Sequence, residues 1–317
     1  MSNEKQQLID LYKDYKARCL FLGEEPKEIR VDQFSYIIDD EDRILLTDWY
    51  DSNLYGSIDI LLPDYFDGIA SIHSFSSIKN LIINNSAIFI SNDALKHLNV
   101  RYIDLNNVEI LGNSAISFTN VKEIKAEKLK YICDSALSYN TNLKELYFPN
   151  VEVCYDFAFC SCKKLEKVIF NNLRLFYTNT FHLCESLSYV DLGGKVVEIP
   201  YQAFIGNNLE RIIGLDSVEK VNARAFMYND KLKYIDLSNC MLIGESAFQS
   251  TNLKKIKLSD SLVGVGDSAF NINNSLFSRL QVDYIGYKKH FLNGVYVSNS
   301  NNYLKWAKVK IIKESEV

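Results

Sequence analysis

The sequence has few of the residues that make linkers and tails: it contains only 4 prolines among 317 residues. It has no proline-rich or serine-rich stretch and no low-complexity tract, so we expect one continuous folded body. Neither sign of charge dominates, and the formal net charge of −5 gives no general attraction to nucleic acid or to anionic membranes. No apolar run reaches the roughly 18 residues that a membrane-spanning helix requires.

The cysteines do not form a disulfide framework. There are seven of them, an odd number, and they lack paired spacing. This usage favours free thiols in a reducing compartment. The first residues are charged and amphipathic and lack the continuous apolar core of a secretory signal. We therefore expect a cytoplasmic protein.

What the sequence does contain is an internal repeat. An alanine followed by a large apolar residue recurs every 21 to 23 residues, and Thr180-Phe181 fills the single gap in the series. Nine such units in phase are the signature of a repeat architecture. The alanines of the series are Ala94, Ala115, Ala136, Ala158, Ala203, Ala225, Ala247 and Ala269.

Each unit also carries an apolar-x-apolar triplet, such as Leu146 and Phe148 or Ile235 and Leu237. This alternation predicts a short strand with one buried face. A second apolar pair precedes the next alanine and belongs to a compact return segment. Since no unit can bury its apolar face alone, the units must stack into a solenoid whose strands form a parallel sheet.

The pattern L-x-x-I-x-L followed by A-F-x-x-C/N-x-x-L is clearest where the second part is Ala158–Leu165 or Ala225–Leu232. It resembles the BspA-type leucine-rich-repeat family. Nine clear units lie in about residues 86–280, and fainter copies extend back to residue 58. The resemblance implies a curved leucine-rich-repeat solenoid of α/β type that serves recognition, with a parallel concave β-sheet and short helical or irregular convex segments. It identifies no partner.

Stacked repeats need caps at their open ends. We expect residues 1–57 to form an N-terminal cap, with an amphipathic helix over residues 3–22 and strands around residues 34–38 and 43–49. The solenoid spans residues 58–280, and residues 281–317 form a C-terminal cap with a hairpin signal at residues 290–297.

One polar column runs through the repeat, four residues after each alanine of the series. Stacked turns bury backbone groups that need partners, and small polar side chains can supply them. We therefore predict an internal hydrogen-bonding ladder. Its members are Leu98, Thr119, Asn140, Cys162, Cys184, Asn207, Asn229, Thr251 and Asn273.

Little in the sequence suggests catalysis or metal binding. Cys160, Cys162 and Cys184 fall in one stack with His182, which makes a metal site an alternative, but a zinc site usually takes two C-x₂₋₄-C pairs. Buried thiols are the main interpretation. The histidines share no motif, and no phosphate-binding loop occurs. We predict no catalytic residue, no metal and no cofactor, and an enzyme activity housed in a cap is the weakest of the functional hypotheses.

The concave face offers a candidate binding patch. Between the inward apolar positions, outward columns bring Tyr147, Ile169 and Tyr189 together, with Tyr234 beyond them. An apolar centre with a charged rim is typical of protein interfaces, although Tyr and Ile also simply suit strands. The predicted rim residues are Glu145, Lys167 and Arg211.

Two functional classes remain open. The first is a cytoplasmic protein-binding module, such as an effector or inhibitor of a bacterium or mobile element. The second is a surface or secreted adhesin, which the family resemblance allows. We expect a protein partner in either case, and no nucleic acid, membrane or small-molecule substrate.

Overall fold

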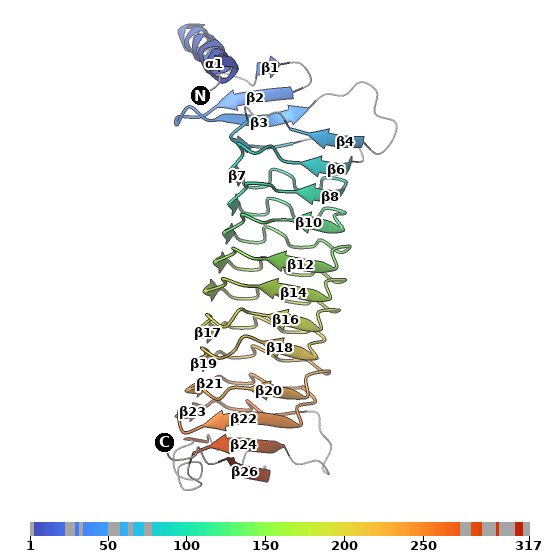
Figure 1. Ribbon diagram of the computed structural model, residues 1–317, viewed down its shortest axis with the longest axis vertical. Helices are drawn as coiled ribbons and strands as arrows, with labels where there is room; N and C mark the ends of the chain where they lie inside the picture. Colours follow the sequence, from blue (N-terminus) through green and yellow to red (C-terminus); the bar gives the residue numbers. More distant parts are fainter. Residues whose placement is uncertain are drawn as a thin grey trace. The chain divides into compact units, whose positions relative to one another are not determined.

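A computed structural model describes residues 3–22, 29–31, 34–49, 58–62, 66–72, 78–272, 280–286, 296–297 and 308–312. The chain divides into two compact units, Met1–Asn140 and Thr141–Val317. In each unit every coil contributes a longer strand and a two-residue strand, and strands of one kind pair in parallel with those of the next coil (Figure 1). The predicted parallel solenoid is confirmed. The two-residue strands come from the second apolar pair of each repeat, which the sequence analysis assigned to a compact return segment.

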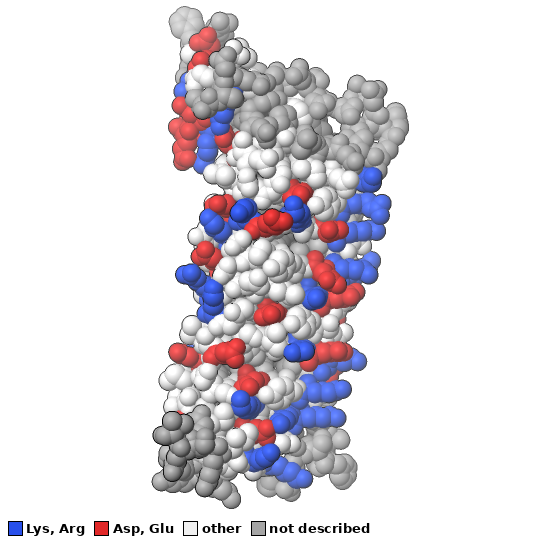
Figure 2. Space-filling view, viewed as in Figure 1, with Lys and Arg blue, Asp and Glu red and all other residues white. Residues whose placement is uncertain are grey.

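In the first unit the longer strands pair in the order β10-β8-β6-β4, and the short ones pair in the order β5-β7-β9-β11. The longer strands are β4 (Ile58–Leu61), β6 (Ile78–Ile82), β8 (Val100–Asp104) and β10 (Glu123–Lys125). The short strands are β5 (Gly68–Ile69), β7 (Phe89–Ile90), β9 (Ile110–Leu111) and β11 (Tyr131–Ile132). Lys and Arg side chains gather along the margin of this unit where the longer strands begin (Figure 2).

The second unit repeats this plan. Its longer strands are β12 (Glu145–Phe148), β14 (Lys167–Phe170), β16 (Tyr189–Asp191), β18 (Arg211–Ile213), β20 (Tyr234–Asp236), β22 (Lys255–Ser259), β24 (Gln281–Ile285) and β26 (Lys308–Ile312). Its short strands are β13 (Val153–Cys154), β15 (Leu175–Phe176), β17 (Glu198–Ile199), β19 (Lys220–Val221), β21 (Leu242–Ile243), β23 (Gly264–Val265) and β25 (Tyr296–Val297).

The longer strands of the second unit form two ladders, β12-β14-β16-β18 and β20-β22-β24-β26. The division falls where Gly214 adds one residue to its coil. Gly214 has φ +75°, and a Cβ at this position would lie 2.7 Å from the backbone nitrogen of Gly193. Only glycine accommodates both the backbone conformation and the close approach. Parallel stacking continues past residue 280, because β24 pairs with both β22 and β26.

The interior of the second unit is filled by a phenylalanine ladder. Successive rings lie 4.9 to 5.4 Å apart between centroids, with interplanar angles of 9° or less. All six rings are fully buried. The alternating apolar residues of the strands pack around them, so this core is complete without any outward side chain. The rings belong to Phe159, Phe181, Phe204, Phe226, Phe248 and Phe270.

The predicted polar ladder is present and buried. Asn229 Nδ2 donates to the carbonyl oxygens of Phe204 (2.7 Å) and Phe226 (2.9 Å), and its side-chain oxygen accepts from the amide of Leu209 (3.2 Å). Asn207 accepts one bond, from the amide of Cys184 at 2.9 Å. These side chains thus satisfy turn backbone within a coil and between coils. Asn273, also predicted for this ladder, lies outside the described residues.

The N-terminal elements match the sequence analysis. Helix α1 (Asn3–Leu22) is followed by β1 (Ile29–Val31), β2 (Phe34–Ile38) and β3 (Ile44–Trp49). β2 pairs antiparallel with β3, while β3 pairs in parallel with β5 and so begins the short-strand row. The hairpin expected at residues 290–297 lies mostly outside the described residues, and its one described part, β25, pairs in parallel with β23.

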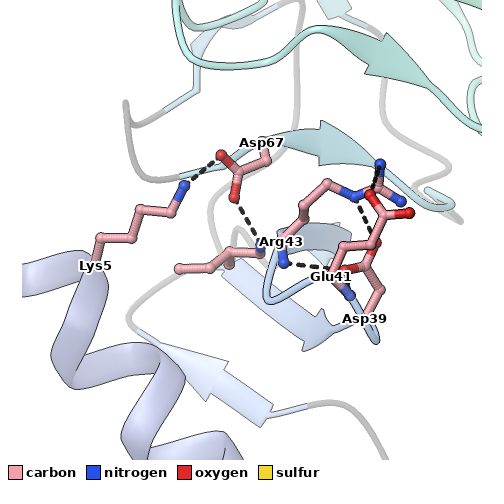
Figure 3. A network of polar contacts seen from close by, with 6 residues as sticks. Lys5, Asp39, Glu41, Arg43 and Asp67 are labelled. Carbon is pink, nitrogen blue, oxygen red and sulfur yellow. Dashed lines mark hydrogen bonds and ion pairs between the residues drawn. The ribbon is translucent and has the colours of Figure 1, made fainter. Parts of the chain in front are cut away.

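A polar network ties these N-terminal elements together (Figure 3). Asp67 accepts a hydrogen bond from the ammonium of Lys5 on α1 and another from the amide of Ile44 at 2.9 Å. Asp39 accepts from the amide of Arg43 at 3.0 Å and from its Nε at 2.7 Å. The guanidinium of Arg43 also lies 4.8 Å above the ring of Phe89 in β7. These contacts fix the helix and the β2–β3 hairpin to the first coils.

Candidate interaction surface

The register of the first ladder in the second unit places the predicted patch residues side by side. Tyr147 of β12 lies opposite Ile169 of β14, and Tyr189 of β16 lies opposite Lys167 of β14. Parallel neighbours are about 4.8 Å apart, so the three outward side chains cover three successive strands. We call Tyr147, Ile169 and Tyr189 the strand-face patch.

The strand-face patch is open to solvent. Tyr147 is 56% exposed, and Ile169 and Tyr189 are half-buried. Asn171 Nδ2 donates a hydrogen bond of 3.0 Å to the hydroxyl of Tyr147, which holds this ring in place from the neighbouring coil. The patch therefore combines apolar area with a fixed polar contact at its margin.

The ring of Tyr189 lies between two cations. The Lys167 ammonium is 5.8 Å from the ring centroid, and the Arg211 guanidinium is 5.9 Å from it. Cation–π contacts at exposed sites contribute about 0.5–1 kcal/mol each. Contacts on both sides limit the motion of the ring, so less conformational entropy is lost when a partner binds against it.

The other predicted residues divide into two groups. Glu145 lies opposite Lys167 at the β12 end of the column, as expected. Tyr234 lies in β20, the first strand of the second ladder, where Lys255 is 5.9 Å from its ring centroid. Burial, followed by the nearby charge of Asp236, raises the pKa of Tyr234. Tyr234 is therefore paired with the strands of its own ladder and not with those of the strand-face patch.

The family comparison covers most of the solenoid. The model of the BspA-type leucine-rich-repeat region matches residues 68–166 and 152–277, with six copies of the repeat. The chain belongs to the BspA-type leucine-rich-repeat family. Members of this family are built from the repeat that forms the coils described above.

Several solved structures are similar to this chain at low identity. A leucine-rich-repeat protein from Bacteroides ovatus shares 15% identity and a TM-score of 0.37, over 90% of this chain and 100% of its own. The pneumococcal vaccine antigen PcpA shares 15% identity and a TM-score of 0.39, over 92% and 99%. A leucine-rich cell-surface protein from Faecalibacterium prausnitzii shares 14% identity and a TM-score of 0.32, over 87% and 100%. A search of curated proteins gave no match.

The stacked cysteines of this BspA-type chain are buried thiols. Cys162 and Cys184 are fully buried, and Cys184 Sγ donates to the carbonyl of Phe159 at 3.1 Å. Burial raises the pKa of the Cys184 thiol well above its ordinary value. His182 Nδ1 contacts the side-chain oxygen of Asn179 at 3.0 Å, and burial lowers its pKa. In the described part of the chain, no three His, Cys, Asp or Glu side chains are grouped as metal ligands would be.

Among the other cysteines and histidines of the sequence, the side chain of Cys19 and the residues His73 and His290 lie outside what the structure describes. Over the described ranges, no helix is both long enough and apolar enough to cross a bilayer.

Two features of the first unit were not singled out from the sequence. Lys79, Arg101 and Lys122 occupy the same position on successive coils, within the start of β6 and β8 or directly before β10, and all three are exposed. Phe118 and Tyr139 stack at 4.3 Å on the neighbouring turns. Both could have been found by writing the repeats under one another and comparing every offset from the alanine, including the outward offsets.

Proposed function

We propose that this chain is a non-enzymatic interaction module and that a protein partner binds the strand-face patch of its second unit. The observation that carries the proposal is an exposed apolar cluster on a coil whose interior is already filled. The phenylalanine ladder packs fully buried beneath the strands, so Tyr147, Ile169 and Tyr189 add nothing to the core. Apolar area kept in water on one side of a sheet is typical of a docking surface.

The patch also has the composition of an interface centre. Tyrosine and arginine are enriched among the residues that dominate binding energy, and charged residues belong at the rim. Here Glu145, Lys167 and Arg211 follow one column beside the apolar residues. We propose that the patch supplies most of the affinity and that the three charges orient the partner and increase its association rate.

The test is a triple substitution of Tyr147, Ile169 and Tyr189 to alanine. The wild type and the variant are used to capture binding proteins, and the dissociation constant of each captured protein is then measured. Because large central side chains commonly contribute more than about 2 kcal/mol, binding should weaken by well over tenfold. The thermal melt should change little, since the three side chains point away from the core.

The second unit offers a matched control in Tyr155, Leu175 and Tyr177. These are also two tyrosines and one aliphatic residue, and they are 38%, 44% and 38% exposed. They lie on the short-strand row and its turns, not on the longer strands. Their triple alanine variant should bind like the wild type. If the patch variant keeps full affinity, or if the control loses as much, the strand face is not the interface.

We also propose that the protein acts in a reducing compartment, as a cytoplasmic adaptor, effector or inhibitor. This is supported by the free thiols of Cys133, Cys154, Cys160, Cys162, Cys184 and Cys240. Cell fractionation combined with a thiol count tests it. Recovery at the cell surface with oxidised cysteines would favour an adhesin instead.

A further inference from the structure

Three cations form a row on the first unit. Lys79 follows Ile78, Arg101 follows Val100, and Ile78 and Val100 are opposite one another in β6 and β8. The amide of Lys122 donates to the carbonyl of Arg101 at 2.8 Å, which places the third cation on the next coil. All three side chains are exposed. Figure 2 shows Lys and Arg gathered along the margin of this unit where the longer strands begin. We call Lys79, Arg101 and Lys122 the cationic row.

Like charges on adjacent strands repel, because neighbouring strands are only about 4.8 Å apart. The nearby acids do not relieve this repulsion. Asp104 pairs with Lys125 at 3.2 Å, and Asp93 pairs with Lys96 at 2.7 Å. Among the residues that the structure describes, no Asp or Glu side chain lies within ion-pair distance of the cationic row. Its charge is therefore available to a ligand.

The fold itself does not require cations at this position. In the second unit the residue before the first outward position of the strand is Lys144, Glu166, Ser188 or Glu210 in the first ladder and Lys233 or Lys254 in the second. Within each ladder the coils stack in the same parallel register. The repeat thus tolerates acidic, neutral and basic residues here, so folding alone does not require the three cations of the first unit.

An aromatic stack accompanies the cationic row. His97 and Phe118 lie four residues before Arg101 and Lys122, and the His97 and Phe118 ring centroids are 5.0 Å apart. Phe118 and Tyr139 stack at 4.3 Å with an interplanar angle of 7° and are each 43% exposed. All three residues have positive φ, at 62°, 56° and 58°. Bulky residues rarely occupy this backbone region, and it costs them free energy.

We propose that this margin of the first unit binds an extended acidic segment of a protein partner. Carboxylates of the segment pair with the cationic row, Arg101 taking one in bidentate fashion, and apolar side chains of the segment contact the ring edges of Phe118 and Tyr139. The charge complementarity is local and short-range, because the whole chain carries a net charge of −5.

Nucleic acid fits this margin less well. Base recognition on single strands uses open aromatic faces, and here the facing surfaces of Phe118 and Tyr139 are occupied by each other. Nucleic-acid binding also needs a larger positive field than three cations on a net acidic protein provide. The site shares no residue with the strand-face patch, so failure of one proposal does not affect the other.

The test is selection from a random linear peptide library displayed on phage, with the full-length protein immobilised. It is run on the wild type and on a variant with Lys79→Gln, Arg101→Gln and Lys122→Gln. A charge-matched control replaces the exposed lysines Lys164, Lys195 and Lys231 of the second unit, which lie off the position of the row, with glutamine. We expect the wild type and the control to enrich acidic peptides that also contain apolar residues. Affinity of the enriched peptides should fall at least about tenfold on the row variant and decrease with added salt.

Enrichment without an excess of Asp and Glu would overturn the proposal, as would equal binding of the selected peptides by the row variant. A labelled single-stranded oligonucleotide is titrated in parallel. If it binds the wild type more tightly than the best peptide and loses affinity on the row variant, the margin is a nucleic-acid site and the proposal is wrong. Circular dichroism of each variant confirms that all three proteins are folded.

Discussion

Asn140 accepts two hydrogen bonds from Thr119 through one oxygen, from its amide at 2.9 Å and from its hydroxyl at 2.7 Å. The side-chain nitrogen of Asn140, Nδ2, donates to the carbonyl oxygens of Ile116 and Leu137, both at 2.9 Å. One buried side chain thus joins two coils of the first unit. Every polar atom it buries has a partner, which is the condition under which a buried polar ladder stabilises a fold.

The ladder predicts unequal effects for two asparagines of the second unit. Asn229 makes three hydrogen bonds, whereas Asn207 makes one and its buried Nδ2 has no hydrogen-bond partner. Replacing Asn229 with leucine leaves three buried backbone groups without this hydrogen-bond partner and should lower stability by about 2–3 kcal/mol. Replacing Asn207 with leucine should cost about 1 kcal/mol, because only the Cys184 amide loses a hydrogen bond and it keeps a longer one, of 3.4 Å, to the Phe181 carbonyl. Chemical denaturation of both variants measures the difference, and equal costs would contradict the assigned bonds.

The turn geometry predicts a stabilising substitution. Tyr228 is 53% exposed and has φ +62°, while Gly206 holds the same position one coil earlier with φ +70°. Glycine carries no Cβ penalty in this backbone region, so Tyr228→Gly should raise stability by about 0.5–1 kcal/mol. Met227→Gly is the matched control. Its backbone does not have positive φ, and we expect it to lower stability by about 1 kcal/mol or more. A drop in melting temperature for Tyr228→Gly would show that the Tyr228 side chain makes contacts that stabilise the fold.

The N-terminal network predicts loosening in acid. Partial burial raises the pKa of Asp39, but hydrogen bonds from Arg43 and Glu41 outweigh it and hold the pKa below its ordinary value. A carboxyl group with a depressed pKa in the folded state contributes its stability above the unfolded pKa and loses it as the pH falls through the folded one. The β2–β3 turn should therefore open below about pH 4.

Amide hydrogen exchange at Glu41 and Arg43, corrected for intrinsic rates, measures this opening. Asp39→Asn should show the opened turn already at neutral pH and little further change in acid. Asp40→Asn should behave like the wild type, because the Asp40 side chain is 100% exposed and its 3.7 Å ion pair with Lys16 is screened by solvent. Protection that stays constant down to about pH 2 would rule out this role for Asp39.

The repeat made much of the solenoid predictable. Since almost every unit has the same length, residues at one offset from the alanine must stack, and the predicted pairings of Tyr147 with Ile169 and of Lys167 with Tyr189 are found in the register. Ile213 lies opposite Asp191, so the same register holds up to the extra residue at Gly214. The repeat period alone was sufficient to predict these pairings, because equal repeat lengths fix the strand register whatever the energy of the individual contacts.

The features that could not be predicted from the sequence depend on the local conformation and packing of the backbone. Two-residue strands such as β9 and β19 are too short for any alternation to show, so the second row of strands did not emerge from the pattern. Positive φ at bulky residues such as Phe118 contradicts local preference and is imposed by stacking. The interruption between β18 and β20 depends on where a coil absorbs one extra residue, which is a matter of backbone packing.

Each inner ring of the phenylalanine ladder stacks on one ring of the coil before it and one ring of the coil after it: Phe226 stacks on Phe204 at 5.4 Å and on Phe248 at 5.2 Å. A coil that was duplicated or deleted in register would therefore meet the same chemistry above and below. Gene duplication and recombination can then change the number of coils without redesigning the interior. Outward residues on either side of such an event would move apart or together in whole-coil steps. The spacing between binding surfaces is thus a quantity that evolution, or an engineer, can adjust in discrete increments while leaving each surface intact.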